Sequence, residues 1–379
     1  MGYGSIERKE TCMEKKKVVG IDIVRAGALL LVIMYHIWVL GAQNQIPIAS
    51  VQRFLQLGGE IGVTLFFALS GFGIFYSLNS TEKREGKIQY FPFLKKRCIR
   101  ILPQYYTNIF LVTMIGVGAY ALTTSNWKDF VSHFLMIHNL SPSYAGSLNG
   151  VLWTMGVTMQ FYLIAILLYK LLMKLKWLFL PLTVFLTIAM KAVAYHYYFD
   201  VLQDGINSFF VGRQCCILTV LDNFTVGMFV AWMVQRKKKD SAVVWLILSI
   251  VSIVALNIIC KYGLVYGIHT NNISGYCWHS LVALAAGVLI LAFAYFPFGS
   301  NGIIVRMFRF LSEYQYGIYL WHLVVINNLL SASGFVAELR NKGYILLLYL
   351  VLCVVSVITG VLMTKAIDEG LMKNWKRSK

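Results

Sequence analysis

The stretch IDIVRAGALLLVIMYHIW, residues 21–38, decides what kind of protein this is. With its flanking residues it is long and apolar enough to cross a bilayer as one helix, which takes about 20 residues. It nevertheless contains an arginine, Arg25, and a histidine, His36. Ionisable side chains are costly inside a membrane, so each marks a candidate functional position.

Arg25 and His36 are expected on one face of this helix. They are eleven residues apart, which is close to three turns and about 16 Å along the axis. We place Arg25 near the inner surface and His36 in the outer half of the membrane. That arrangement suits a long ligand whose anionic end stays inside while its reactive end reaches outward. The simpler alternatives are a snorkelling anchor for Arg25 and an interhelical hydrogen bond for His36.

The composition supports a helical membrane protein. Of 379 residues, 58% are hydrophobic and only 13% are charged, about half the charged fraction of a soluble domain. The apolar runs lack the alternation of barrel strands. We predict an all-α bundle of about ten transmembrane helices, at residues 19–40, 57–79, 101–123, 149–172, 177–198, 211–235, 242–261, 279–298, 310–332 and 343–365.

The distribution of positive charge predicts the orientation. With the N-terminus inside, most of the 34 Lys and Arg residues fall in inner segments, as the positive-inside rule requires. Both termini are then cytoplasmic, as basic tails at 1–18 and 366–379 of a single membrane domain, 1–379. Topology and attraction to anionic lipid account for the net charge of +18, so we expect a multi-pass protein of the cell (plasma or inner) membrane and no nucleic-acid partner.

Other polar residues in the spans extend the set of candidates. Glu60 lies near the outer end of the second span, where it either pairs with His36 across the helix interface or is a solvated rim residue. Arg97 and Arg100 lie three residues apart at a predicted helix start and fit phosphate oxygens, although they also satisfy the positive-inside rule. Asp222 needs a partner on another helix. The seven cysteines show no metal-ligand or disulfide spacing, and we predict no metal site.

Six stretches together resemble the acyltransferase family 3 of integral-membrane proteins. The Arg25-to-His36 spacing is the most specific. It is followed in order by FFALSGF (66–72), the Arg97/Arg100 pair, LWTMGVTMQFYL (152–163), LDNFTVGM (221–228) and YGIYLWH (316–322). The resemblance covers about residues 18–365.

The resemblance implies a ten-helix enzyme that moves an acyl group from cytoplasmic acyl-CoA, usually acetyl-CoA, to a hydroxyl of an envelope or extracellular carbohydrate. It makes His36 the catalytic residue and Arg25, Arg97 and Arg100 the donor-binding residues, with no permanently bound cofactor. Because the chain ends after the tenth span, we expect the stand-alone form.

Two departures from the family pattern leave alternatives open. Family members commonly carry acidic residues where this chain has Thr64, Thr158 and Met159. Either Glu60 supplies the missing carboxylate or His36 has a weaker partner. A catalytically inactive member and a small-solute transporter are the rival interpretations.

The mechanism we predict is acyl transfer to an alcohol. Neutral His36 takes the hydroxyl proton as the alcohol attacks the thioester; a covalent acyl-histidine is the variant. Ser70, Tyr162 or Gln160 are candidates to stabilise the oxyanion, and His322, in the last motif, is a further candidate. The sequence fixes neither the acceptor nor the oligomeric state.

Overall fold

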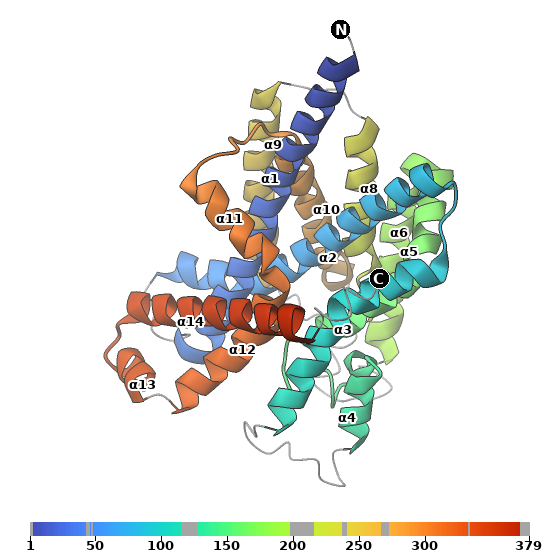
Figure 1. The fold of residues 1–379 in the computed structure, drawn as a ribbon. Helices are drawn as coiled ribbons and strands as arrows, with labels where there is room; N and C mark the ends of the chain where they lie inside the picture. The colour runs from blue at the N-terminus through green and yellow to red at the C-terminus, as the bar shows by residue number, and fades with distance from the viewer. Residues whose placement is uncertain are drawn as a thin grey trace.

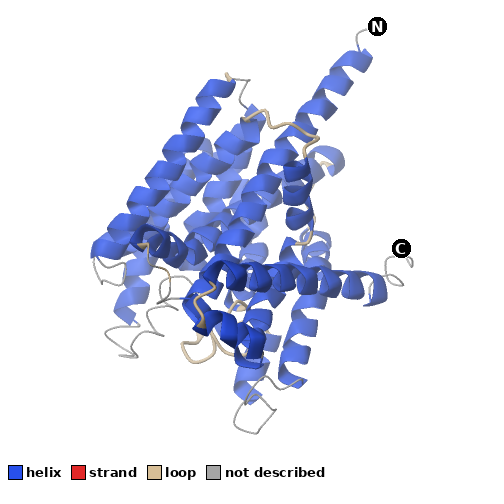
Figure 2. Cartoon of the chain, turned by 90° about the vertical axis from the view of Figure 1, so that its left-hand side faces the viewer, coloured by secondary structure: helices blue, strands red, loops and turns tan. Residues whose placement is uncertain are grey.

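The fold was analysed in a computed structural model, which describes residues 3–42, 46, 48–114, 127–197, 216–236, 241–266, 273–332 and 334–371. Every regular element among these residues is helical (Figures 1 and 2). The long helices are α1 (Tyr3–Ile37), α2 (Ala49–Glu85), α3 (Tyr90–Met114), α5 (Trp153–Leu175), α6 (Phe179–His196), α8 (Leu221–Arg236), α9 (Ala242–Tyr266), α10 (Ile273–Tyr295), α12 (Gln315–Ala332) and α14 (Ile345–Lys365). Shorter helices are α4 (Trp127–Phe134), α11 (Ile303–Glu313) and α13 (Gly334–Asn341).

Six segments of the described chain are long and apolar enough to cross a membrane: Val19–Gly41, Ala49–Glu85, Trp153–His196, Ala242–Ile259, Ile273–Tyr295 and Ile345–Lys365. The segment Trp153–His196 covers two of the predicted spans. The predicted spans at 101–123, 211–235 and 310–332 coincide in part with α3, α8 and α12, which are helical but are not among the six. The all-helical, multi-pass prediction is therefore confirmed, and the count of ten stays a prediction.

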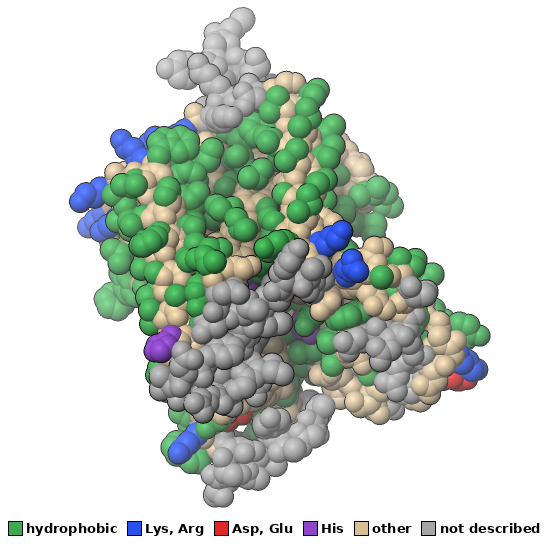
Figure 3. Space-filling view, turned by 180° about the vertical axis from the view of Figure 1, so that it is seen from behind, with side chains coloured by type: hydrophobic (Ala, Val, Ile, Leu, Met, Phe, Trp, Pro, Cys, Tyr) green, Lys and Arg blue, Asp and Glu red, His purple; other side chains and the backbone are tan. Residues whose placement is uncertain are grey.

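The outer surface of the bundle is apolar. Figure 3 shows one face covered broadly by hydrophobic side chains and interrupted by few Lys and Arg side chains. On α9, Ile247, Ile250 and Ile253 are all more than half exposed. Such a surface is stable against lipid rather than water.

Helix α2 is the centre of the bundle, because it packs along both α1 and α8. Its contact with α8 depends on two glycines. A Cβ at Gly71 would clash with the carbonyl of Phe224, and one at Gly227 would clash with the carbonyl of Ala68. Small residues at such points let helix backbones touch, and in the FFALSGF stretch Gly71 provides this contact.

A compact segment between α3 and α5 covers one end of the bundle. It contains α4, where Asp129 and His133 are buried while Trp127 and Phe134 are each 54% exposed. The polar face of this helix therefore points inward and its apolar face outward, opposite to a helix at a water interface. The orientation of α4 therefore fits contact with lipid.

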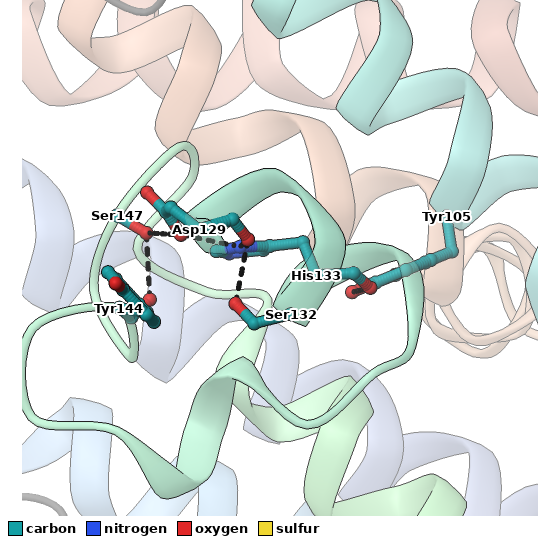
Figure 4. Close-up of polar contacts among 6 residues, drawn as sticks. All are labelled: Tyr105, Asp129, Ser132, His133, Tyr144 and Ser147. Atoms are coloured by element: carbon teal, nitrogen blue, oxygen red, sulfur yellow. Dashed lines mark hydrogen bonds and ion pairs between the residues drawn. The ribbon is translucent and has the colours of Figure 1, made fainter. Parts of the chain in front are cut away.

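Hydrogen bonds hold this segment together (Figure 4). Asp129 Oδ1 lies 2.9 Å from His133 Nδ1 and accepts from Ser147 Oγ at 2.8 Å. The Tyr105 hydroxyl donates to the His133 carbonyl at 2.8 Å, which ties the segment to α3. The His133 ring stacks on His138 with centroids 3.8 Å apart. Burial and the neighbouring His133 lower the pKa of His138 to about 3.

Candidate active site

Two histidines from helices far apart in sequence meet inside the bundle. His322 Nε2 lies 3.1 Å from His36 Nδ1, and their rings are 4.9 Å apart at 62°. His36 comes from α1 and is half-buried; His322 comes from α12 and is fully buried. The sequence singled out both residues but did not predict that they pair.

The backbone contacts of the two rings assign their protons. His322 Nδ1 lies 2.6 Å from the Tyr319 carbonyl, and a carbonyl only accepts, so this nitrogen carries hydrogen and His322 Nε2 is an acceptor. His36 Nδ1 lies 2.9 Å from the Val32 carbonyl, so it too carries hydrogen, shared between that carbonyl and His322 Nε2. His36 Nε2 is then left with its lone pair and can accept a proton.

Tyr319 connects the histidine pair with an internal cavity. Its ring centroid is 5.6 Å from that of His322 and 5.4 Å from that of Phe66. Its hydroxyl lies 3.0 Å from Thr154 Oγ1. Because the Thr154 hydroxyl donates to the Val151 carbonyl, the Tyr319 hydroxyl is the donor to Thr154.

The cavity has a volume of about 460 Å³ and is lined by residues of α1, α2, α3, α5, α11 and α12. Four cations line it, Arg25, Lys96, Arg97 and Arg100, together with one carboxylate, Glu313. Most of its remaining wall is apolar or hydroxyl-bearing and includes Ser70, Thr158, Tyr162, Phe66 and Tyr319. The predicted donor-binding arginines thus share one cavity with Ser70 and Tyr162, and Tyr319 links that cavity to the histidine pair.

Neighbouring side chains fix two of the arginines. Arg25 Nη1 donates to Ser312 Oγ at 3.1 Å and lies 3.4 Å from Asp22 Oδ1, and Ser312 Oγ donates to Asp22 at 2.7 Å. Arg97 is buried, and its Nη2 donates to Ser77 Oγ at 2.6 Å. Both guanidinium groups are therefore oriented, as bidentate phosphate recognition requires. Asp22 could have been predicted, because it precedes Arg25 by three residues and shares its helix face.

Glu60 has a different partner from the one the sequence suggested. Its Oε2 lies 3.1 Å from His279 Nε2, on α10, while the side chain beside His36 is the imidazole of His322. The predicted pairing of Glu60 with His36 is corrected accordingly: α2 presents Glu60 to α10. A catalytic role for Glu60 stays a prediction.

Asp222 lies outside the cavity lining. It is fully buried on α8, and its electrostatic partner is Lys191 of α6, also fully buried. Its backbone N–H donates to Thr187 Oγ1 at 3.1 Å. The expected partner on another helix is therefore Lys191; Arg213, a cation of the same predicted span, lies outside the described residues.

Hydroxyls occupy two of the three positions where family members commonly carry acid. Thr64 is buried, and Thr158 lines the cavity while its hydroxyl donates to the Thr154 carbonyl at 2.7 Å. Gln160 is engaged elsewhere, with Asn139 and the backbone of Ile217, and is not part of the cavity wall. No group of three or more potential metal ligands occurs among the residues that the structure describes.

An all-helical bundle with a buried histidine pair and an arginine-lined cavity defines the class: a multi-pass membrane protein with polar groups gathered inside the bundle. Residues 18–365 match the family model described as "Acyltransferase domain", and the chain belongs to this family, acyltransferase family 3.

Two relatives are similar over different extents. The peptidoglycan O-acetyltransferase OatA of Listeria monocytogenes serovar 1/2a is 29% identical over 168 residues, which are 41% of this chain and 25% of OatA; the match thus spans a quarter of that protein. The "Putative acetyltransferase ORF330" of Acidianus two-tailed virus is 26% identical over 336 residues, 88% of this chain and 90% of that protein. No solved structure matches the chain.

Proposed function

We propose that this protein is a membrane-bound O-acetyltransferase that moves an acetyl group from cytoplasmic acetyl-CoA to a hydroxyl of an envelope carbohydrate. Membership of the family supports acyl transfer. The name of OatA, a peptidoglycan O-acetyltransferase, favours a carbohydrate acceptor. The observation that carries the proposal is the cavity whose cationic wall and Tyr319 connect Arg97 and Arg100 with the His36–His322 pair.

The basic end of the cavity fits the nucleotide of coenzyme A. Arg25, Lys96, Arg97 and Arg100 provide positive charge for its phosphates. The pantetheine arm then lies along the less polar wall of α2 and α5, with its thioester toward Tyr319. In this orientation the basic face is cytoplasmic, in agreement with the positive-inside rule.

The histidine pair supplies the acid–base chemistry. His36 Nε2 accepts the proton of the attacking hydroxyl while the new C–O ester bond forms. The C–S bond of the thioester breaks as the tetrahedral intermediate collapses, and the imidazolium returns the proton to the departing thiolate. His322 Nε2, which accepts from His36 Nδ1–H, orients the ring and stabilises its cationic form, as the third group does in a triad.

Tyr162 and Ser70 are the lining hydroxyls that we assign as candidate donors to the oxyanion. The Tyr319 hydroxyl does not fit this role in the conformation observed, because its hydrogen points to Thr154. For the thioester to reach His36, the Tyr319 ring must rotate away from Phe66.

A substitution that fills the arginine-lined cavity tests whether this cavity binds the acetyl donor. A Cβ at Gly73 meets nothing within 4 Å, and Gly73 lines the cavity, so Gly73→Leu places its side chain in the open space. Gly27 also has no neighbour within 4 Å but does not line the cavity, so Gly27→Leu is the matched control.

Two measurements apply to both variants: thermal stabilisation of the purified protein by acetyl-CoA, and transfer of labelled acetyl to envelope glycans in membrane vesicles. Gly73→Leu should lose both and Gly27→Leu neither. A Gly73→Leu protein that folds and still transfers acetyl at the wild-type rate would refute the assigned donor site. Wild-type protein that shows neither stabilisation nor transfer would instead favour the inactive-member or transporter interpretation.

A further inference from the structure

A second hollow lies on the lipid-facing side of the bundle, apart from the donor cavity. It has a volume of about 370 Å³ and lies among α1, α2, α9 and α10. None of its lining residues lines the donor cavity. Two of its wall residues, Phe54 and Ile253, are 47% and 53% exposed, so the hollow opens outward as a groove.

Helix periodicity gives the groove a polar rim. On α2, Ser50 and Arg53 are three residues apart, and on α9, Asn257 and Lys261 are four apart. Each pair therefore occupies one face of its helix. The first pair stands at the start of α2 and the second near the end of α9, so the two polar faces meet at one mouth of the groove.

Below this rim the same two helix faces are apolar. On α2 the groove continues along Phe54, Leu57, Ile61 and Leu65, and on α9 along Leu256 and Ile253. On α2, Leu57, Ile61 and Leu65 are each about one helical turn apart and therefore lie on one face. The groove therefore has a cationic head and an apolar tail, which follow one another along α2 and α9.

Within the described part of the chain, the two cations of the rim have no anionic partner. Neither Arg53 nor Lys261 forms an ion pair or hydrogen bond with any residue that the structure describes, and both are exposed. The groove lining contains no Asp or Glu. Two converging cations without a carboxylate leave a local positive charge that an anionic ligand would neutralise.

The rim also lies far from the arginines of the donor cavity. Arg53 precedes Ser77, the partner of Arg97, by 24 residues of α2, which is about 36 Å along a helix. This distance exceeds the ~30 Å thickness of the hydrocarbon core. We therefore place the rim at the membrane surface opposite to the donor-cavity arginines. The positive-inside rule accounts for cations at the inner surface only, so it does not explain Arg53 and Lys261.

We propose that this groove binds one anionic phospholipid of the leaflet away from the basic face. The lipid phosphate lies between Arg53 and Lys261, with Ser50 and Asn257 as additional hydrogen-bond partners. One acyl chain lies along Leu57, Ile61 and Ile253. The combination of a cationic rim and an apolar groove favours a lipid over a soluble phosphate, because only a ligand with an acyl chain contacts the apolar part of the groove. The site does not depend on the acetyl-transfer reaction proposed above.

Native mass spectrometry of the full-length protein, delipidated in detergent, tests the headgroup. Phosphatidylglycerol, phosphatidylcholine and glycerol 3-phosphate are added separately, and bound copies are counted. We expect one tightly held phosphatidylglycerol, at least about tenfold weaker phosphatidylcholine and no glycerol 3-phosphate. Arg53→Gln with Lys261→Gln should remove the tight phosphatidylglycerol, whereas Lys174→Gln with Arg306→Gln, which removes two exposed cations elsewhere, should retain it.

A steric pair of variants tests the acyl-chain part. Ile253 lines the groove and Ile250 does not, although they are on the same helix and 53% and 54% exposed. Ile253→Trp should fill the groove and weaken phosphatidylglycerol binding at least about tenfold, while Ile250→Trp should leave it unchanged. Equal affinity for the two phospholipids, binding of glycerol 3-phosphate alone, or equal effects of the two tryptophan variants would overturn the proposal.

Discussion

His322 Nε2 lies 3.1 Å from His36 Nδ1, with the other ring nitrogen of His322 held by the Tyr319 carbonyl. A histidine base usually relies on a carboxylate to orient it. Here the neighbour is a neutral imidazole, which accepts the same hydrogen bond without placing a second charge in the bilayer. A buried carboxylate at that position would be costly to ionise. The histidine pair therefore orients His36 without adding a negative charge inside the membrane.

Removing either histidine should affect transfer to different degrees. His36→Ala should lower acetyl transfer on the order of 10²–10⁴-fold, the usual contribution of a general base. His322→Ala should lower it at least about tenfold, and His322→Gln should recover part of the loss because its amide oxygen accepts a hydrogen bond. Transfer is measured per folded protein with labelled acetyl-CoA in vesicles. Full activity of His36→Ala would contradict the assignment.

Arg97 and its partner Ser77 provide a prediction for donor binding. Ser77→Ala leaves the guanidinium in place but removes its 2.6 Å anchor, so we expect KM for acetyl-CoA to rise about three- to tenfold with kcat little changed. Arg97→Ala with Arg100→Ala should raise KM at least about 30-fold, since two phosphate-binding forks are lost. Steady-state kinetics separates the two constants. A fall in kcat alone would point to the chemical step instead.

The segment around α4 should lose stability in acid. The pKa of His138 is lowered to about 3 by burial and by His133, whereas an unfolded histidine titrates near 6.5. Below pH 6.5 the opened segment therefore binds more protons than the closed one, so stability is complete above pH 6.5 and falls as the pH drops toward 3. At pH 5 the loss is about 2 kcal/mol.

Hydrogen exchange of residues 127–152 at pH 7.5 and pH 5 measures this effect, after correction for the intrinsic exchange rates. Protection should be lower at pH 5, and His138→Asn should reduce the difference between the two pH values. Equal corrected protection at both would exclude the titration of this histidine as the cause.

The glycine contact between α2 and α8 should be intolerant of a methyl group. Gly71→Ala would push its Cβ into the Phe224 carbonyl, and overpacking of this kind costs about 1–3 kcal/mol or more. Gly73→Ala, two residues along the same helix, meets only open space. The apparent melting temperature in detergent should fall for Gly71→Ala and stay within a few degrees of wild type for Gly73→Ala. Similar values for the two would show that α2 and α8 can separate without loss.

The buried Lys191–Asp222 pair should be strongly coupled. Asp222→Asn leaves Lys191 without its opposite charge, and breaking a buried pair from one side costs about 3–5 kcal/mol. Adding Lys191→Met removes the remaining charge, so the double variant should be more stable than Asp222→Asn alone. A thermal double-mutant cycle measures this. Additive losses would mean that the two side chains do not interact.

The sequence predicted the helical membrane fold because apolar runs of bilayer length can be read directly. The family pattern singled out Arg25, Arg97 and Arg100, which line one cavity, and their role in donor binding stays a prediction. The sequence did not predict the His36–His322 pair or the role of Tyr319. Those contacts depend on how α1 and α12 cross. The two histidines are 286 residues apart in the sequence, and helix periodicity relates only residues within the same helix. For Glu60 the sequence left open a pairing with His36 or a solvated rim position, because the rotation of α2 about its axis cannot be read from one helix; in the structure Glu60 lies beside His279 of α10.

The position of Tyr319 bears on the ion permeability of the membrane. A passage open from one surface to the other would let protons and small ions leak and would dissipate the transmembrane voltage. The Tyr319 side chain, hydrogen bonded to Thr154 and packed on Phe66, lines the arginine-rich cavity and also lies beside His322, so we expect it to interrupt such a passage. In the proposed reaction the acetyl group would then cross the barrier while the ionic gradients on either side stay intact.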